Sequence, residues 1–230
     1  MAVAPENSMP AFEIGLAAGA DILEMDVQLA ADGQVMVFHD DSLEPKTGVP
    51  GRIAHYPAHF LQTLDVGRWF HNDFARTSIP LLKDVLAWAK GRIPLMIEIK
   101  HDAFSSPDLD AAVVALIEQY QMVDQVVCIA FDQFCLQRLK RLNPSLTTSF
   151  IYVCRPLNPL ALVAGLKVDA FSPATNYLSA AEVGLIQAAG YACTPGGWWW
   201  DFPTLLAWGV DTVSSNDPAG ARKTLDSLLR

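Results

Sequence analysis

Two acidic residues interrupt an apolar stretch near the start of the chain. Glu24 and Asp26 stand two positions apart in Ile22–Val27, where every other residue is apolar. Side chains along a strand repeat with a period of two, so we expect both carboxylates on one face of a strand. Two like charges held side by side repel unless they share a proton or a cation. The pair therefore predicts a divalent-cation site, because hard cations take carboxylate oxygens as ligands.

A second apolar stretch adds a third acid. Glu98 and Lys100 stand two positions apart at the end of Leu95–Lys100, whose other residues are apolar, so both are expected on one face of another strand. An ordinary solvated strand face would also carry such a pair. The surrounding apolar run instead favours a buried parallel strand, which makes Glu98 a further candidate ligand of the same cation.

A histidine follows a predicted hairpin. Asp32 and Gly33 form a strong turn signal between the strand of Glu24 and the apolar run Val35–Phe38. Such a turn would fold His39 back towards the two acids. The histidines of the loop that follows are expected at the surface or in packing contacts.

The composition favours one domain, spanning residues 1–230, with a large core. The chain has 230 residues, of which 51% are hydrophobic. Its formal net charge of -9 argues against a nucleic-acid or anionic-membrane partner. A phosphate-bearing substrate would therefore be held locally, by a metal or by Lys100. No run reaches the roughly 18 apolar residues of a membrane span, so stable membrane insertion is not expected.

The cysteines indicate a reducing compartment. They show no Cys-x-x-Cys spacing and lie in apolar or helical contexts, so we expect reduced core thiols. The first ten residues have neither the basic start nor the apolar segment of a signal peptide. The expected localisation is cytoplasmic.

A long irregular segment follows the hairpin. Residues 42–80 are punctuated by glycine and proline, and their apolar pattern is weak, so loops and short helical pieces are expected there. An insertion of this length in a compact domain is usually a lid or a binding loop. We therefore expect a small insertion over about 42–80, after the second strand of the fold.

Beyond Pro80 the predicted helices and strands alternate regularly. Strands are expected at 95–99, 126–130, 147–153, 169–172, 191–194 and 210–214. Helices are expected at 81–90, 107–120, 132–142, 159–166, 179–189, 202–208 and 218–229. This alternation predicts an α/β fold with a parallel sheet.

The strand of Glu24 brings the expected strands to seven, one short of an eight-stranded barrel. A helix expected over 10–18 stands where the first strand of such a barrel would be. Functional groups of these barrels lie at the carboxyl ends of the strands. Glu24, Asp26, Glu98 and Lys100 lie towards that end, so we expect them in one shared site.

Several motifs, taken in order, resemble the glycerophosphodiester phosphodiesterase family, the GDPD family of the PLC-like phosphodiesterase superfamily. Ala4–Ser8 is similar to its APENT segment, Leu23–Val27 to its IExDV strand, and Phe38–Asp40 to its HD motif. Ile97–Lys100 is similar to its EIK strand, and the likeness extends to Gly209–Pro218. The order and spacing of these segments together make the resemblance specific.

The resemblance implies a TIM barrel that cleaves glycerophosphodiesters, as small-molecule substrates, into sn-glycerol 3-phosphate and an alcohol. It implies that Glu24, Asp26 and Glu98 bind Ca²⁺ or Mg²⁺, that His39 is one general acid or base, and that Lys100 contacts the phosphate. A hard cation with a histidine that titrates near neutrality suits this chemistry. In the mechanism usually proposed for the family, the glycerol 2-hydroxyl attacks phosphorus and water then opens the cyclic phosphate.

Two segments depart from the family pattern. The family's first strand ends in an HRG motif, with a second catalytic histidine and a phosphate-binding arginine, where this sequence has Met1–Val3. The expected fold is therefore a barrel without its first strand. A WTVN-like segment of the family is replaced by Thr194–Trp200, whose tryptophans Trp198, Trp199 and Trp200 form either a substrate wall or aromatic packing over the barrel mouth.

Three interpretations of the chain follow. In the favoured one, upstream codons supply the HRG motif and the protein is an ordinary enzyme. In the second, it is a truncated, non-catalytic homologue that binds a metal or a phosphodiester. In the third, its carboxylates serve a related phosphodiesterase acting on lysophospholipid or phosphoinositide head groups. An upstream HRG motif would separate the first from the second, and substrate profiling would identify the third.

Overall fold

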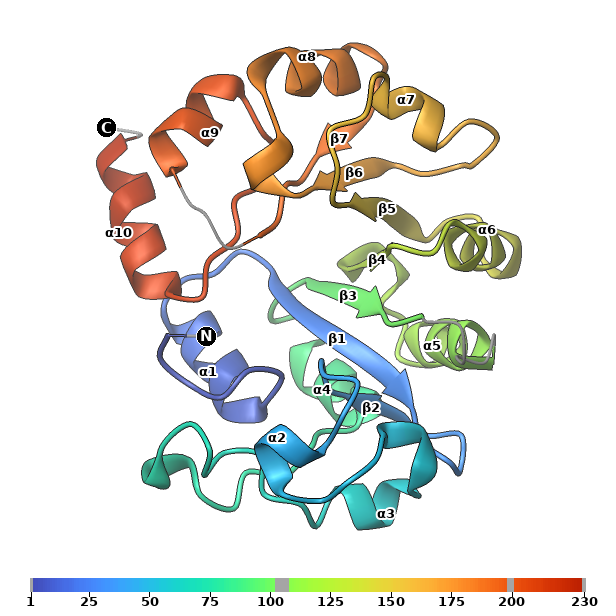
Figure 1. Ribbon diagram of the computed structural model, residues 1–230, viewed down its shortest axis with the longest axis vertical. Coiled ribbons are helices and arrows are strands. Elements are labelled where there is room, and N and C mark those ends of the chain that lie inside the picture. Colours follow the sequence, from blue (N-terminus) through green and yellow to red (C-terminus); the bar gives the residue numbers. More distant parts are fainter. Residues whose placement is uncertain (1, 102–107, 198–200, 229–230) are drawn as a thin grey trace.

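Seven strands form one sheet in the part of the chain that the structure, a computed structural model, describes, namely residues 2–101, 108–197 and 201–228. The strands are β1 (Leu23–Leu29), β2 (Val35–Val37), β3 (Leu95–Ile99), β4 (Val126–Ala130), β5 (Thr147–Tyr152), β6 (Ala170–Pro173) and β7 (Ala192–Cys193). Their order in the sheet is β2-β1-β3-β4-β5-β6-β7, and every neighbouring pair is parallel except β1 and β2. The sheet curves within a ring of helices (Figure 1). The carboxyl ends of its parallel strands therefore share one end of the fold.

The predicted hairpin joins β1 to β2. Val27 of β1 lies opposite Val37 of β2 in an antiparallel ladder. Gly33 occupies the turn with a φ of 76°, a conformation that suits a residue without a Cβ atom. The hairpin brings the end of β2 back beside β1, as the sequence predicts.

The α-helices that flank the sheet agree with the expected ones. They are α1 (Met9–Ala17), α4 (Leu82–Ala89), α5 (Asp108–Gln119), α6 (Gln133–Leu142), α7 (Pro159–Leu162), α8 (Ala180–Ala188), α9 (Phe202–Trp208) and α10 (Pro218–Leu228). Ser8 caps α1 by accepting a hydrogen bond from the N–H of Ala11, which satisfies one of the unpaired donors of the first turn. Only α7 is clearly shorter than expected: it ends at Leu162, and the chain continues in turns in which Gly165 adopts a left-handed conformation.

The segment between β2 and α4 contains the expected loops and short helices. Its helices are α2 (Glu44–Thr47) and α3 (Ala58–Leu61), with 3₁₀ turns at Ile53–His55 and Asn72–Phe74. Apolar side chains of this segment form a second core cluster with residues of the hairpin; the cluster includes Met36, Phe38, Leu43, Ile53, Leu61 and Ile79. We call this segment, residues 42–80, the insertion. The shared cluster packs the insertion against β2, and the two lie beside each other in Figure 1.

The strand expected at 210–214 is absent from the described residues, and this prediction is wrong. The segment makes one backbone bond to β7, from the N–H of Asp211 to the carbonyl of Cys193. The N–H of Cys193 is taken by the side chain of Asp211 rather than by a carbonyl. Further along, Pro195 has no N–H to donate and its carbonyl accepts from the hydroxyl of Ser214. Side-chain bonds and a proline therefore interrupt the ladder at this edge.

Two further expectations concern cysteine and tryptophan. The four cysteines are free thiols; Cys128, Cys135 and Cys193 are buried as expected, whereas Cys154 is exposed, contrary to the prediction of a core thiol, because it follows the end of β5. The tryptophans at 198–200 lie outside the described residues.

Among the helices of the described chain, none has both the length and the apolar character that crossing a membrane requires.

Candidate active site

The register between β1 and β3 brings the predicted carboxylates together. The two strands are parallel, with Asp26 directly opposite Glu98. Each of Glu24, Asp26 and Glu98 offers a carboxylate oxygen within 4.8 Å of the others. Asp26 and Glu98 are largely buried, with side chains 7% and 12% exposed, whereas Glu24 is exposed to solvent. The period-two spacing thus places three acids on one face of the sheet.

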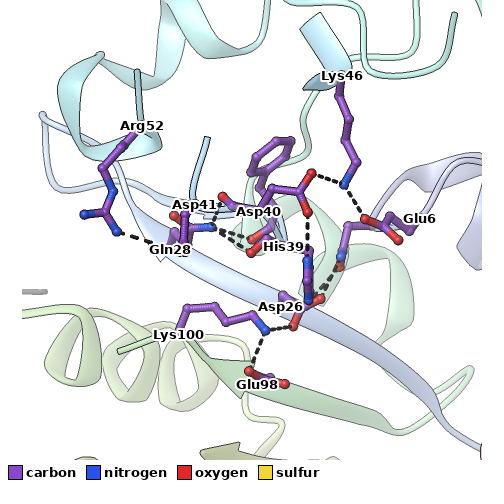
Figure 2. Close-up of polar contacts among 12 residues, drawn as sticks. Glu6, Asp26, Gln28, His39, Asp40, Asp41, Lys46, Arg52, Glu98 and Lys100 are labelled. Atoms are coloured by element: carbon purple, nitrogen blue, oxygen red, sulfur yellow. Dashed lines mark hydrogen bonds and ion pairs between the residues drawn. The ribbon is translucent and has the colours of Figure 1, made fainter. Parts of the chain in front are cut away.

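Lys100 lies directly against two of these acids (Figure 2). Its Nζ is 2.9 Å from Oδ1 of Asp26 and 2.6 Å from Oε1 of Glu98. Burial would lower the pKa of Lys100, but the attraction of these two carboxylates outweighs it, and the pKa is raised. Lys100 is therefore a fixed positive charge between the acids.

One ammonium group does not balance the three acids. Solvent reaches Glu24, but the protein around it replaces much of its hydration. This desolvation raises the pKa of Glu24 well above 4.5, and repulsion from Asp26 and Glu98 raises it further. Burial and the charge of Asp26 also raise the pKa of Glu98, against the opposing effect of Lys100. The cluster consequently favours taking up a proton or a cation.

A residue of the loop before α1 orients Asp26. The side-chain amide of Asn7 donates from Nδ2 to Oδ2 of Asp26 at 2.8 Å, and its Oδ1 accepts from the N–H of Asp26 at 2.9 Å. Asn7 has a φ of 53°, a left-handed conformation that asparagine tolerates better than most residues. It thereby satisfies a strand N–H that no neighbouring strand takes. Asn7 enters the sequence-based expectations only within the APENT-like segment Ala4–Ser8, so its contact with Asp26 was missed.

His39 stands at the end of β2, on the same side as the acids. The side chain of Gln28, on β1, donates from Nε2 to the carbonyls of Phe38 and Asp40, each at 3.0 Å. These bonds fix the backbone that carries His39. The ring is about half exposed, and its Nδ1 lies 2.8 Å from Oδ1 of Asp40.

A second cluster of possible ligands comes from α5, from α6 and from the residue that follows Lys100. His101, Asp110 and Cys135 offer ligand atoms within 4.8 Å of one another. Arg138 already pairs with Asp110, and burial raises the pKa of Cys135 far above its ordinary value, with Asp110 adding to the effect. Arg138 thus already supplies the positive charge that a metal ion would bring, and the thiol of Cys135 stays protonated. The all-oxygen set on β1 and β3 is the better site for a hard cation.

Comparison with known proteins identifies the family. A model of the glycerophosphoryl diester phosphodiesterase family matches residues 2–219. The chain belongs to this family. The recognition based on the ordered motifs is therefore confirmed, and the chain is a member of a family of phosphodiesterases.

Relatives and solved structures of the family match this chain, some of them over nearly its whole length. A glycerophosphodiester phosphodiesterase of Caldanaerobacter subterraneus subsp. tengcongensis is 28% identical, with 98% of this chain and 93% of the relative aligned. One from Bacillus altitudinis is 35% identical over 61% of this chain and 58% of its own length. The structure of a phosphodiesterase from Oleispira antarctica, in complex with the product sn-glycerol-3-phosphate, has a TM-score of 0.90 and 25% identity, and the match covers 97% of this chain and 92% of that chain. The TIM-barrel fold expected from the sequence is confirmed.

Proposed function

We propose that this protein hydrolyses glycerophosphodiesters to sn-glycerol 3-phosphate and an alcohol, with the help of a divalent cation. The convergence of Glu24, Asp26 and Glu98 at one end of the barrel carries the proposal. Family membership supports the reaction class, and a relative of the same fold is bound to sn-glycerol-3-phosphate as its product. The substrate is accordingly a small molecule with a phosphodiester group.

The three carboxylates are the proposed ligands of Ca²⁺ or Mg²⁺. Their donor set is all oxygen, and the raised pKa values of Glu24 and Glu98 mark an excess of negative charge, as a hard cation requires. When bound, the cation would polarise the phosphoryl group and neutralise charge in the reaction. Asn7 keeps Asp26 oriented towards this position through its two hydrogen bonds.

Lys100 and His39 are the proposed partners of the substrate itself. The ammonium group of Lys100, directed to the same end of the barrel, would contact a phosphate oxygen. His39 would take the proton of the attacking glycerol 2-hydroxyl, or give a proton to the oxygen of the leaving alcohol. Its Nδ1 is occupied by Asp40, so Nε2 is the atom for this transfer.

Release of sn-glycerol 3-phosphate from glycerophosphocholine tests the proposal. The protein is assayed with Ca²⁺, with Mg²⁺ and with a chelator, beside Glu24→Ala and a control, Glu13→Ala, which removes an exposed acid of α1. We expect cation-dependent turnover that Glu13→Ala keeps and Glu24→Ala loses. Turnover that is unaffected by the chelator or by Glu24→Ala would refute the cation site, and absence of turnover with both cations would refute the function.

A further inference from the structure

A lysine of the insertion is buried against the end of β2. Lys46 lies on α2, and its side chain is 8% exposed. The Nζ atom is 2.8 Å from Oδ2 of Asp40 and also contacts Oε1 of Glu6. It stands over the rings of Phe38 and Trp69, 5.1 and 5.4 Å from their centroids. A long cationic side chain is costly to bury unless its charge is paired, and Asp40 and Glu6 supply that pairing.

Asp40 links this lysine to the histidine of the proposed active site (Figure 2). One carboxylate oxygen, Oδ1, meets Nδ1 of His39 at 2.8 Å, and the other, Oδ2, meets Lys46. Both oxygens of the Asp40 carboxylate are thus held by a partner. Burial would raise the pKa of Asp40, but the hydrogen bonds from Lys46 and His39 outweigh it and lower the pKa. Asp40 therefore stays ionised and can accept a hydrogen bond from the N–H at Nδ1 of His39.

We infer that Lys46 is a positioning residue for proton transfer by His39. It fixes Asp40, and Asp40 fixes the tautomer and the direction of the imidazole, so that Nε2 is presented to the substrate. The inference rests on the proposed function for its catalytic meaning. It also gives the insertion a specific task, because Lys46 and Trp69 both belong to residues 42–80.

A purely structural role for Lys46 makes a different prediction. If the lysine only attached the insertion to the barrel, its loss would lower stability without changing the state of the imidazole. The backbone of His39 is held separately by Gln28 of β1. Removing Lys46 should therefore free the ring while leaving the loop in place.

Three lysine variants separate these roles. Lys46→Met removes the charge and keeps much of the apolar stem, and Lys46→Arg restores a cation in contact with Asp40. Lys90→Met is the matched control, because Lys90 is exposed, donates to Gln121 on the surface and follows α4 at the opposite end of the barrel. A control that loses nothing excludes a general effect of replacing lysine by methionine.

The first measurement observes the ring directly. Long-range proton–nitrogen NMR spectra, recorded at pH 8 and assigned with His39→Ala, report which imidazole nitrogen carries the proton. We expect the wild type, Lys46→Arg and Lys90→Met to show the tautomer protonated at Nδ1. Lys46→Met should show a mixture of tautomers instead. An unchanged tautomer in folded Lys46→Met would overturn the inference.

The second measurement is turnover of glycerophosphocholine, with calorimetric binding of Ca²⁺ or Mg²⁺ as its companion. Lys46→Met should lower kcat by about a hundredfold, as a misplaced catalytic group does, with KM and cation affinity nearly unchanged and with rescue by Lys46→Arg. Equal kcat for Lys46→Met and the wild type would overturn the inference. If the wild type itself shows no turnover, the proposed function fails, and the NMR spectra alone then decide the positioning role.

Discussion

Removal of Glu98 should abolish binding of a divalent cation. The Glu98→Ala variant leaves Asp26 and Glu24 with Lys100 as their counter-charge and deletes one of three converging oxygens. Isothermal calorimetry with Ca²⁺ and with Mg²⁺ measures the loss, and Glu13→Ala on α1 serves as the control. Unchanged affinity for both cations in Glu98→Ala would show that these carboxylates do not bind the metal.

Removal of His39 should lower turnover without affecting cation binding. The ring contacts Asp40 and is about half exposed, so its loss should leave cation binding and folding intact. Turnover should fall by about a hundred- to ten-thousandfold, the usual contribution of one acid or base. The control is His59→Ala, which deletes an exposed ring on α3. Full turnover in His39→Ala would exclude proton transfer by this residue.

At the residue scale, local spacing predicted the acids, and it missed Asn7, which orients Asp26, and Lys46, which contacts Asp40. Glu24, Asp26 and Glu98 follow the period of a strand, so one alternating pattern places all of them on one face. Asn7 and Lys46 come from a loop and a short helix, where no periodicity fixes the direction of a side chain. Their contacts depend on how distant segments pack, which a single sequence does not reveal.

At the scale of elements, a buried ionic network joins β3 to α5 and α6. Asp110 of α5 accepts from His101, just after β3, at 2.5 Å and from Arg138 of α6. Burial would raise the pKa of Asp110, but these hydrogen bonds outweigh it and hold the pKa below 3.8. Its contribution to stability is therefore present above about pH 3.8 and is lost as the pH falls through the lowered value.

The Asp110→Asn variant should expose this contribution. Breaking a buried ion pair costs about 3 kcal/mol of unfolding free energy, so denaturant unfolding at pH 7 should show a loss of that order. The loss should shrink below the lowered pKa, where the wild-type carboxyl is protonated too. Asp124→Asn, at an exposed position, is the control. A loss that stays the same from pH 7 down to the onset of acid unfolding would contradict the ionic origin of the effect.

Helices begin close to their expected starts at two places where a side chain caps the first turn. Helix α6 begins after Asp132, whose side chain accepts from the N–H of Phe134, and α1 begins after Ser8. The segment at 210–214 reads as a strand from its apolar residues, but Asp211 uses its side chain where a ladder needs a carbonyl. Strand propensity alone does not supply hydrogen-bond partners.

At the scale of the whole molecule, the alternation of helices and strands predicted the parallel barrel, and the barrel explains why the site is charged. Side chains from β1 and β3 converge where Asp26 lies opposite Glu98, near the carboxyl end of β3, and the single charge of Lys100 does not balance the three acids there. Burial, and then repulsion from the neighbouring acids, raises the pKa values of Glu24 and Glu98. Their contribution to stability is present below their ordinary value of 4.5 and is lost as the pH rises through the raised values.

A bound cation should restore at neutral pH the stability that this repulsion removes. With the cation at about 100 times its Kd, the gain is about 2.7 kcal/mol, or roughly 5–10 °C in Tm for a chain of this size. At pH 5 protons compete for Glu24 and Glu98, so the gain in Tm should be smaller than at pH 7.5. Scanning calorimetry with Ca²⁺ or Mg²⁺ and with a chelator measures both gains. The double variant Glu24→Gln, Glu98→Gln should show neither gain, and a gain that it retains, or one independent of pH, would place the cation elsewhere.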